Sequence, residues 1–381
     1  MPPPGSLRIA CIASGLGQIR RGLETWMGQL ALHLQSQPGV QGEAWGGGRA
    51  FPQSCPSHRI RLIARDSVVL RGVPWHYRYH VEQMSAVIPI AWELRRRRMH
   101  IAFCADPSLA WNVKRLRRWH GAKVVFSDGM RLSPRWLQDY DGIHLLAPYY
   151  LEEARPQVRP ERFDRFFAVP YFVDAQLFRP ALPEARARTR TRLGASAGDR
   201  VALTVGPVGS DSSKRLDHIA QELALTGDPR WHLWSVGGDE NGAEMVRGRC
   251  REALGDRVHF LGSLPRETLP EIYQAADVYT LGALAEPFSI AILEALATGL
   301  PVIHHHYAVT EWITGDAGRS VDMTVAGAAA KAFHQFSLAT EAGRTAGDAA
   351  LRLTGIRYTP EVVVGQLIQQ FDRLLGESYA G

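Results

Sequence analysis

Short apolar runs alternate with segments of helical period along most of the chain. The runs that we predict as strands are Leu7–Ala13, His100–Cys104, Lys123–Ser127, Gly142–Leu146, Arg200–Gly206, Trp231–Val236, Val258–Leu261, Val278–Leu281 and Pro301–His304. The segments that we predict as helices are Leu23–Leu34, Pro107–Trp119, Leu216–Ala224, Ala243–Leu254, Leu269–Ala275, Ser289–Thr298 and Pro360–Leu375. Apolar strands that alternate with amphipathic helices are typical of parallel sheets covered by helices on both faces. The pattern therefore predicts an α/β protein.

The series of strands and helices restarts near residue 200, which indicates two domains. The stretch from Tyr171 to about Arg192 is rich in Pro, Arg and Ala, and we interpret it as a connector. A length of 381 residues suits two domains of ~150 residues with some surplus. We predict an N-terminal Rossmann-like domain over residues 1–175, completed by the C-terminal helix within 360–381, and a second over 176–359. Both would be doubly wound and face a cleft.

Charge is distributed unevenly along the chain. Residues 1–175 carry 24 basic and 14 acidic side chains, whereas residues 176–381 carry 20 and 24. An anionic partner of the N-terminal half would explain the excess, and so would a solvated charged face without function. Nucleic acid is disfavoured, because no recognised binding motif accompanies the charge. Only four of the 44 basic residues are lysines, so each lysine needs an explanation: Lys114, Lys123, Lys214 and Lys331.

Neither membrane spans nor disulfides are indicated. No run reaches the ~18–20 apolar residues of a spanning helix, since Glu294 interrupts the longest candidate, Phe288–Ile303. The first residues lack the charged and apolar regions of a signal peptide. The four cysteines form no C-x-x-C pair. We therefore expect a cytoplasmic protein with reduced, buried cysteines.

Two carboxylates, Glu286 and Glu294, bracket a transition from loop to helix. If the helix begins near Ser289, its free backbone N–H groups favour an anion in the loop. Glu294 would then lie about a turn and a half inside the helix, where it could accept hydrogen bonds from a ribose diol. The alternative for Glu294 is a solvated helix residue, but its neighbours in sequence are mostly apolar.

This segment resembles the E-x7-E motif of retaining glycosyltransferases with the GT-B fold, in the large family-4 group called glycosyl transferases group 1. Other stretches are similar to motifs of that family in the expected order: Ser14–Glu24, Val169–Asp174, Phe178–Pro180, Val205–Val208 with Lys214-Arg215, Ser235–Asp239 and Val258–Gly262. The matches are strong from residue 200 to 315 and weak before residue 165.

The resemblance implies a nucleotide-sugar donor in the second domain and an acceptor in the first. Lys214 would hold the donor diphosphate, Glu286 would lie near the sugar hydroxyls, and Glu294 would bind the ribose. The catalytic candidates are thus Glu286, Lys214 and Asp106, and the donor-binding candidates are Gly15, Gly17, Arg215, Gly237, Phe288, Ser289, Ile290 and Glu294. No cofactor or metal is expected, because cationic side chains and helix N-termini supply the positive field.

The chain also departs from the family pattern. Pro207 stands where the family usually has an arginine, and Phe103–Pro107 lacks the usual histidine. Asp106 is the nearest functional candidate there, and the alternative is a helix N-cap before Pro107. Asp128 holds a similar position after the next strand, and we predict it as an acceptor-binding residue. A glycine pair of the family is replaced by His304–His306, one of which could touch the sugar; a metal cluster there is disfavoured, since neighbours in an extended segment point in opposite directions.

The residues and the resemblance together predict a retaining, metal-independent glycosyltransferase, with a UDP-sugar as the favoured donor. The acceptor is open: a lipid-linked or cell-surface glycan, or a small molecule. The basic N-terminal half suits an anionic acceptor or peripheral contact with an anionic membrane at its inner face. Two alternatives remain, namely a catalytically degenerate GT-B protein that acts as a binding subunit and a GT-B-fold nucleotide-sugar epimerase. Pro207 and the missing histidine motivate the first.

Overall fold

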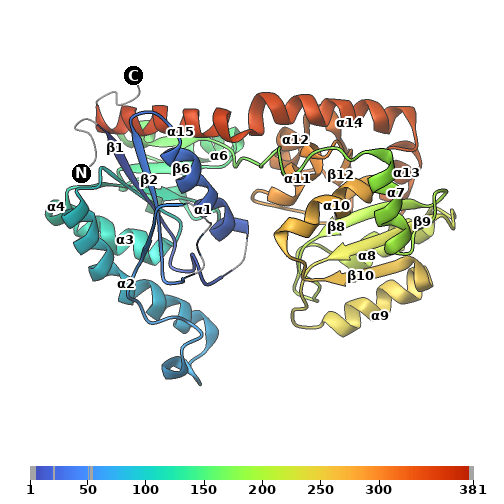
Figure 1. Cartoon of the computed structure of the whole chain (residues 1–381), viewed down its shortest axis with the longest axis horizontal. Coiled ribbons are helices and arrows are strands. Elements are labelled where there is room, and N and C mark those ends of the chain that lie inside the picture. Colours follow the sequence, from blue (N-terminus) through green and yellow to red (C-terminus); the bar gives the residue numbers. More distant parts are fainter. Residues whose placement is uncertain (1–5, 20–21, 50, 52–54, 377–381) are drawn as a thin grey trace. The chain divides into compact units, whose positions relative to one another are not determined.

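The computed structural model describes residues 6–19, 22–49, 51 and 55–376, and it divides the chain into two compact units (Figure 1). The first unit comprises Met1–Tyr171 and Pro360–Gly381, and the second comprises Phe172–Thr359. The first boundary falls at Tyr171 rather than at residue 175. Val173 belongs to the second unit because its backbone N–H donates to the carbonyl of Tyr358 at 2.9 Å.

The first unit is built on a parallel sheet of seven strands in the order β3-β2-β1-β4-β5-β6-β7. Its strands are β1 (Leu7–Ile12), β2 (Val40–Gly46), β3 (Ser57–Arg59), β4 (Ile101–Cys104), β5 (Lys123–Ser127), β6 (Gly142–Leu145) and β7 (Phe166–Ala168). Its helices are α1 (Gly22–Gln35), α2 (Trp75–Arg97), α3 (Pro107–Arg115), α4 (Arg117–His120), α5 (Pro134–Leu137), α6 (Pro148–Ala154) and α15 (Pro360–Leu375).

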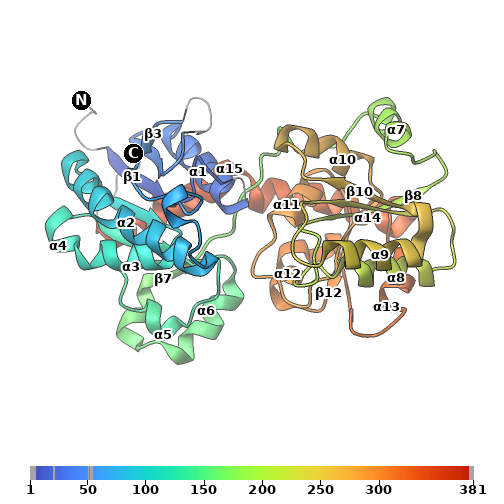
Figure 2. The ribbon, with the colours of Figure 1, turned by 90° about the horizontal axis from the view of Figure 1, so that it is seen from below.

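Helices cover both faces of this sheet. α1 and α15 pack together on one face, where Trp26 of α1 and Phe371 of α15 both contact Phe103 of β4. α2, α3 and α4 form a second group of neighbours (Figure 2). β1, β4, β5 and β6 lie between these layers and are almost completely buried. Burial on both faces explains why their sequences read as continuous apolar runs.

The second unit contains a parallel sheet of six strands in the order β10-β9-β8-β11-β12-β13. Its strands are β8 (Arg200–Val205), β9 (Trp231–Val236), β10 (Val258–Gly262), β11 (Val278–Leu281), β12 (Val302–His305) and β13 (Gly318–Val321). Its helices are α7 (Pro183–Arg192), α8 (Leu216–Leu225), α9 (Ala243–Leu254), α10 (Leu269–Ala275), α11 (Ile290–Ala297), α12 (Ala308–Thr314), α13 (Ala328–Gln335) and α14 (Glu341–Leu353).

The core of the second unit likewise lies between sheet and helices. α8 packs against both α9 and α13, and the apolar side chains of the three helices join Trp231 and Leu233 of β9 in a buried cluster. α7, α10, α11 and α14 form another set of neighbours. The predicted architecture of two doubly wound α/β units is therefore confirmed.

Several elements differ from the prediction. The stretch interpreted as a connector contains the helix α7, whose sequence is almost entirely polar. The predicted helix Pro107–Trp119 is divided at Leu116 into α3 and α4. β2, α2, β13, α13 and α14 lie outside the predicted elements.

Burial and hydropathy add two facts. All four cysteines are buried and free. Within the described ranges, no helix is both long enough and apolar enough to cross a membrane.

Candidate functional site

Each sheet has one place where the strand order reverses direction. β1 lies between β2 and β4, and β8 lies between β9 and β11, so the chain winds outward from β1 and from β8 in both directions. In open α/β sheets, ligands bind beyond the carboxyl ends of the strands at such a switch point. The loops that follow β1 and β4, and those that follow β8 and β11, are therefore the places where chemistry is expected.

In the second unit an ion pair bridges the switch point. Lys214 follows β8 and Glu286 follows β11, and the lysine Nζ lies 2.5 Å from a carboxylate oxygen of Glu286. Their side chains are 17% and 13% exposed. The pair is thus held in place by protein on most sides and remains open to solvent on the rest. The structure brings together the two residues that the sequence singled out for the donor.

Glycines let the loops after β8 and β9 approach each other. A Cβ atom on Gly237 would lie 1.9 Å from the carbonyl oxygen of Gly206, which no side chain can tolerate. A Cβ atom on Gly206 would lie 2.7 Å from Cγ of Lys214, so the lysine stem runs directly over this glycine. Gly237 therefore shapes the edge of the site through its backbone.

The side chain of Arg215 bonds backbone carbonyls of the second unit. Its backbone is left-handed with φ of 49°, and its guanidinium donates to the carbonyls of Gly282 at 3.3 Å and Met323 at 3.2 Å. The side chain thereby ties the loop after β8 to the loops after β11 and β13. A role for Arg215 in donor binding stays a prediction.

Glu294 is a buried carboxylate with two donors, which excludes the alternative of a solvated residue. Arg266 donates to one oxygen at 2.9 Å and Tyr273 to the other at 2.8 Å, and the residue is 4% exposed. Burial raises the pKa of Glu294, and the charge of Arg266 opposes that rise. Arg266 and Tyr273 are not among the residues predicted from the sequence. The available signal was that Arg266 follows β10 at the carboxyl edge where the other candidates lie.

Ser289 begins the helix that carries Glu294. It is the N-cap of α11, and its hydroxyl accepts from the backbone N–H of Ile292 at 3.4 Å. Ser289 and Phe288 are buried. Tyr279 lies buried in β11, and its pKa is raised first by burial and next by the charges of Glu286 and Glu294.

In the first unit a buried carboxylate bridges the switch point. Asp106 follows β4 and accepts from the backbone N–H of Ser14, which follows β1, at 2.5 Å, and from the hydroxyl of Tyr79 at 2.6 Å. Asp106 makes no capping bond to α3; Gln83 accepts from the N–H groups of Ser108 and Leu109 instead. Asp106 thus holds the N-cap position before Pro107, as the alternative interpretation had it, but its carboxylate bonds Ser14 and Tyr79 rather than the helix. Burial raises the pKa of Asp106.

A second buried pair supports the loop after β1. Arg65 and Glu82 are 4% and 0% exposed, and their side chains are joined at 2.5 Å. Arg65 also approaches the hydroxyl of Ser14 at 3.4 Å and lies 4.3 Å from the ring centre of Tyr79. A Cβ atom on Gly15 would lie 2.8 Å from Glu24. This network, which the sequence did not reveal, fixes the course of the glycine-rich loop; the neighbouring Arg20 and Arg21 lie outside the described residues.

Gly17 and Asp128 shape their own loops. Gly17 has φ of 80°, a conformation that favours glycine. The carboxylate of Asp128 accepts from the backbone N–H groups of Met130 at 3.0 Å and Leu132 at 3.0 Å, and burial raises its pKa. Acceptor binding by Asp128 stays a prediction.

The three consecutive histidines have separate partners. His304 is buried and bonds Thr314, His305 accepts from the backbone of Met323, and His306 bonds Ser320 at 2.5 Å. Their imidazoles therefore support β12 and its neighbours, and contact of any of them with a sugar stays a prediction.

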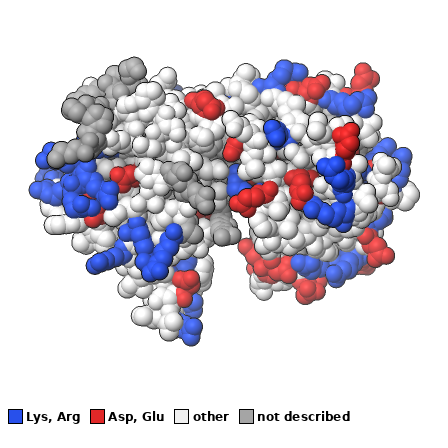
Figure 3. Space-filling view, viewed as in Figure 1, with Lys and Arg blue, Asp and Glu red and all other residues white. Residues whose placement is uncertain are grey.

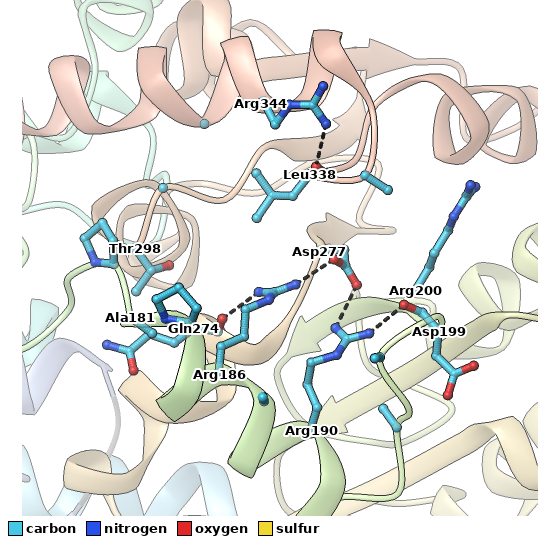
Figure 4. Close-up of a pocket in the computed structure, with 18 of the residues that line it drawn as sticks. Ala181, Arg186, Arg190, Asp199, Arg200, Gln274, Asp277, Thr298, Leu338 and Arg344 are labelled. Carbon is cyan, nitrogen blue, oxygen red and sulfur yellow. Dashed lines mark hydrogen bonds and ion pairs between the residues drawn. The ribbon is translucent and has the colours of Figure 1, made fainter.

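A cavity of about 840 Å³ lies elsewhere in the second unit (Figure 4). Asp277, which immediately precedes β11, accepts from Arg186 at 2.6 Å and from Arg190 at 3.0 Å, so both arginines fasten α7 to the amino edge of the sheet. None of the predicted donor residues belongs to the described lining. The cavity therefore lies away from the switch point, and its best-placed cations already have partners.

Comparison with known proteins agrees with this geometry. Residues 199–337, which contain Lys214, Gly237, Glu286 and Glu294, match the family model described as "Glycosyl transferases group 1". The match covers a little over a third of the chain, so similarity to this family is shown for this segment of the second unit.

Curated relatives and solved structures show how far the similarity extends along the chain. The chain is 31% identical over 140 residues to D-inositol 3-phosphate glycosyltransferase of Corynebacterium urealyticum, which covers 34% of this chain and 32% of that protein. The matches to the first curated relatives thus span about a third of their length. Sucrose-phosphate synthase of Thermosynechococcus elongatus has a TM-score of 0.79 at 20% identity, covering 97% and 99% of the two chains.

The fold likeness also includes a structure with a bound nucleotide sugar. HepE of Anabaena, solved in complex with UDP-glucose, has a TM-score of 0.72 at 13% identity and covers 96% of this chain and 99% of its own. The likeness over nearly the whole chain establishes the GT-B fold.

Proposed function

We propose that this chain is a glycosyltransferase that moves a sugar from a nucleotide-diphosphate sugar to an acceptor, with retention at the anomeric carbon and without a metal ion. The observation that carries the proposal is the ion pair of Lys214 and Glu286 at the switch point of the second unit, within the segment that matches the family. A UDP-sugar is the favoured donor, and the complex of HepE with UDP-glucose supports that choice.

In the proposed mechanism Lys214 neutralises the departing diphosphate. Its ammonium group lies against Glu286 in the structure, and a diphosphate carries more negative charge than one carboxylate. The ammonium would therefore turn toward the phosphates when the donor binds. The N–H groups at the start of α11 add positive potential at the same edge of the sheet. Together these groups stabilise the charge that develops on the leaving group, which is the role that a metal ion has in other transferases.

The two glutamates would hold the sugar and the ribose. Glu286, once Lys214 has turned to the diphosphate, is free to accept hydrogen bonds from hydroxyls of the donor sugar. Glu294 keeps its place because Arg266 and Tyr273 hold one oxygen each. Each of these oxygens has a further lone pair, with which it can accept a bond from a ribose hydroxyl. The backbone of Gly237, Phe288 and Ile290 would line the same donor site.

The first unit would contribute the acceptor side. Asp128, which follows β5, would bind the acceptor, and Asp106, which follows β4, would act in catalysis. The loop with Gly15 and Gly17, which follows β1, would approach the donor diphosphate. Curated relatives include D-inositol 3-phosphate glycosyltransferase and mannosylfructose-phosphate synthase, and each of these names refers to a phosphorylated compound. An anionic acceptor would suit the excess of basic residues in the N-terminal half.

The test is nucleotide release from individual UDP- and GDP-sugars. The Lys214→Ala variant should lose roughly 100- to 1,000-fold in turnover, since one preorganised charge contact is removed from the transition state. Lys331→Ala, which changes an exposed lysine of the same unit, is the matched control and should keep full activity. Equal release by the wild type and the Lys214 variant would exclude the proposed role.

The products separate this proposal from its alternatives. A transferase releases free nucleotide and forms a glycoside whose anomeric configuration equals that of the donor, and added EDTA leaves its rate unchanged. An epimerase would return an altered sugar still attached to the nucleotide. Thermal stabilisation by UDP without release from any sugar donor, in the presence of candidate acceptors, would favour a binding subunit.

A further inference from the structure

The solvent-facing side of α2 is apolar. Tyr77, Met84, Ile88 and Trp92 are separated by seven, four and four residues, so they share one face of the helix. They are 58%, 38%, 63% and 56% exposed. The opposite side of α2 already packs on the sheet through Ala86, Val87, Ile90, Ala91 and Leu94, which are buried. A helix needs only one apolar face to join a core, so the second apolar face has another purpose.

The C-terminal end of this face is rich in arginine and tryptophan. A cavity of about 710 Å³ is lined by Trp92, Trp119, Arg95, Arg96, Arg98 and Arg118, among others. The ring centres of the two tryptophans are 6.1 Å apart, and the guanidinium of Arg95 lies 5.7 Å from the ring centre of Trp119. Cationic and amphipathic aromatic side chains therefore meet at one place.

Basic side chains outnumber acidic ones on this surface, although Glu43 pairs with Arg97 and Asp141 pairs with Arg117 from outside the segment. Residues 84–121 contain eight basic and two acidic side chains. Of the two acids, Asp106 is buried, and Glu93 is paired with Arg96 at 2.7 Å and Arg97 at 3.0 Å. Basic side chains gather at the left edge of the space-filling view, where the ribbon places α4 (Figure 3). An anionic partner would therefore be attracted to it.

We propose that this α2 face, made of Tyr77, Met84, Ile88, Trp92, Arg95, Arg98, Arg118 and Trp119, docks on an anionic phospholipid membrane. Ile88 and Trp92 would enter the boundary between headgroups and acyl chains, as the apolar face of an amphipathic helix does. Tryptophan is favoured at that depth. The arginines would bind lipid phosphates. Docking does not depend on sugar transfer, so each can fail without the other.

A membrane explains more of this face than a nucleic acid does. RNA could stack on Trp92 and Trp119 and pair with the arginines. It would leave Ile88 and Met84, which stand about one and two turns N-terminal to Trp92, exposed to water without purpose. A flat, partly apolar and anionic surface accounts for the aliphatic and the basic side chains together.

The first experiment is flotation of the full chain with vesicles, in the absence of any nucleotide sugar. The chain should float with vesicles of phosphatidylcholine and phosphatidylglycerol and bind pure phosphatidylcholine much less. Arg98→Gln combined with Arg118→Gln should weaken binding roughly 25-fold, since each exposed basic residue near an anionic surface contributes roughly fivefold. Arg188→Gln combined with Arg352→Gln, at two exposed arginines of the second unit, is the matched control and should change nothing.

The second experiment tests the apolar stripe. Ile88→Glu combined with Trp92→Glu should reduce binding by at least a hundredfold, whereas Ile356→Glu, at a position of the second unit that is 74% exposed, should have no effect. Circular dichroism checks that each variant is folded. The proposal is overturned if the wild type does not float with anionic vesicles, or if the Ile88 and Trp92 variant floats as well as the wild type. Tighter binding to single-stranded RNA than to vesicles, lost in that same variant, would replace the membrane by nucleic acid and would also overturn it.

Discussion

The two switch points have the same topology, but different groups bridge their loops. In the first unit Asp106 bridges the loops after β4 and β1, it is 4% exposed, and its carboxylate accepts from Ser14 and Tyr79. In the second unit Lys214 and Glu286 bridge the loops after β8 and β11, and both remain partly exposed. One connection is buried and supplied with donors, and the other is an ion pair within reach of solvent.

The difference indicates how the two units divide their work. A buried group that is satisfied by hydrogen bonds fixes the loops around it, because any rearrangement would leave a polar atom unpaired. A partly exposed ion pair can exchange its partner for a ligand at small cost, since water screens the charges that separate. We therefore expect substitutions near Asp106 to reduce stability first, and substitutions at Lys214 to reduce donor turnover first.

The largest expected effect tests the rigidity of the first unit. Arg65→Met would leave the fully buried Glu82 without its cation and should destabilise the first unit by about 3–5 kcal/mol. Hydrogen exchange of the β1 and β4 amides measures this without assuming that both units unfold together. Arg159→Met removes an exposed ion pair with Asp139 and should cost less than about 1 kcal/mol. If the two variants lose similar stability, the first switch point is not rigidly built.

Acid should lower the stability of the first unit through the buried side chain of His144. His144 contacts Trp26 and Phe103, and burial lowers its pKa to about 4. The folded protein therefore binds fewer protons at this site than the unfolded chain, whose histidines titrate near pH 6.5. Stability is then lost as the pH falls from about 6.5 toward 4, by up to about 3 kcal/mol.

The His144→Gln variant should remove this part of the pH dependence. Urea unfolding at a series of pH values, followed by the same amide exchange, measures the slope. His306→Gln, at an exposed position of the second unit, serves as the control and should keep the slope of the wild type. An unchanged slope in His144→Gln would mean that other groups cause the acid sensitivity.

The smallest expected effect concerns one hydrogen bond. Tyr79→Phe removes one of the two donors to Asp106 and keeps the ring on which Arg65 lies. The loss should be about 1 kcal/mol. Tyr149→Phe, which removes a less buried bond to Glu153, should cost less. Stability unchanged by Tyr79→Phe would contradict the view that the donors of Asp106 fix the loop after β1.

Regular apolar patterns made much of the fold predictable. Trp231–Val236, Lys123–Ser127 and Pro360–Leu375 were predicted with the boundaries that β9, β5 and α15 have, because each combines a strong pattern with clear ends. β2 was missed because its sequence, VQGEAWG, mixes glycine and charge. Packing explains the glycine. A Cβ atom on Gly42 would lie 2.4 Å from the carbonyl oxygen of Ala31, so α1 can pack this closely against β2 only if residue 42 is glycine.

The site was predictable only where its residues form a local motif. Glu286, Glu294 and Lys214 stand in stretches that can be compared with a family. Arg266 and Tyr273 lie 28 and 21 residues from the Glu294 that they hold, and no period of a helix or strand connects them. α7 shows the same limit, since its polar sequence is held by Arg186 and Arg190 through Asp277, about 90 residues away.

The position of α15 has a consequence for biosynthesis. A chain emerging from a ribosome exposes all of the second unit, Phe172–Thr359, before any residue of α15 appears. Until then the first unit lacks Phe371 against Phe103 and Leu374 against Gly142, so the part of this sheet face that α15 covers beside α1 stays open. The unit that is begun first is thus completed last. Premature release of a nascent chain would yield a folded second unit joined to an incomplete first unit with exposed apolar surface. Such a species is prone to aggregation and is a typical substrate of chaperones.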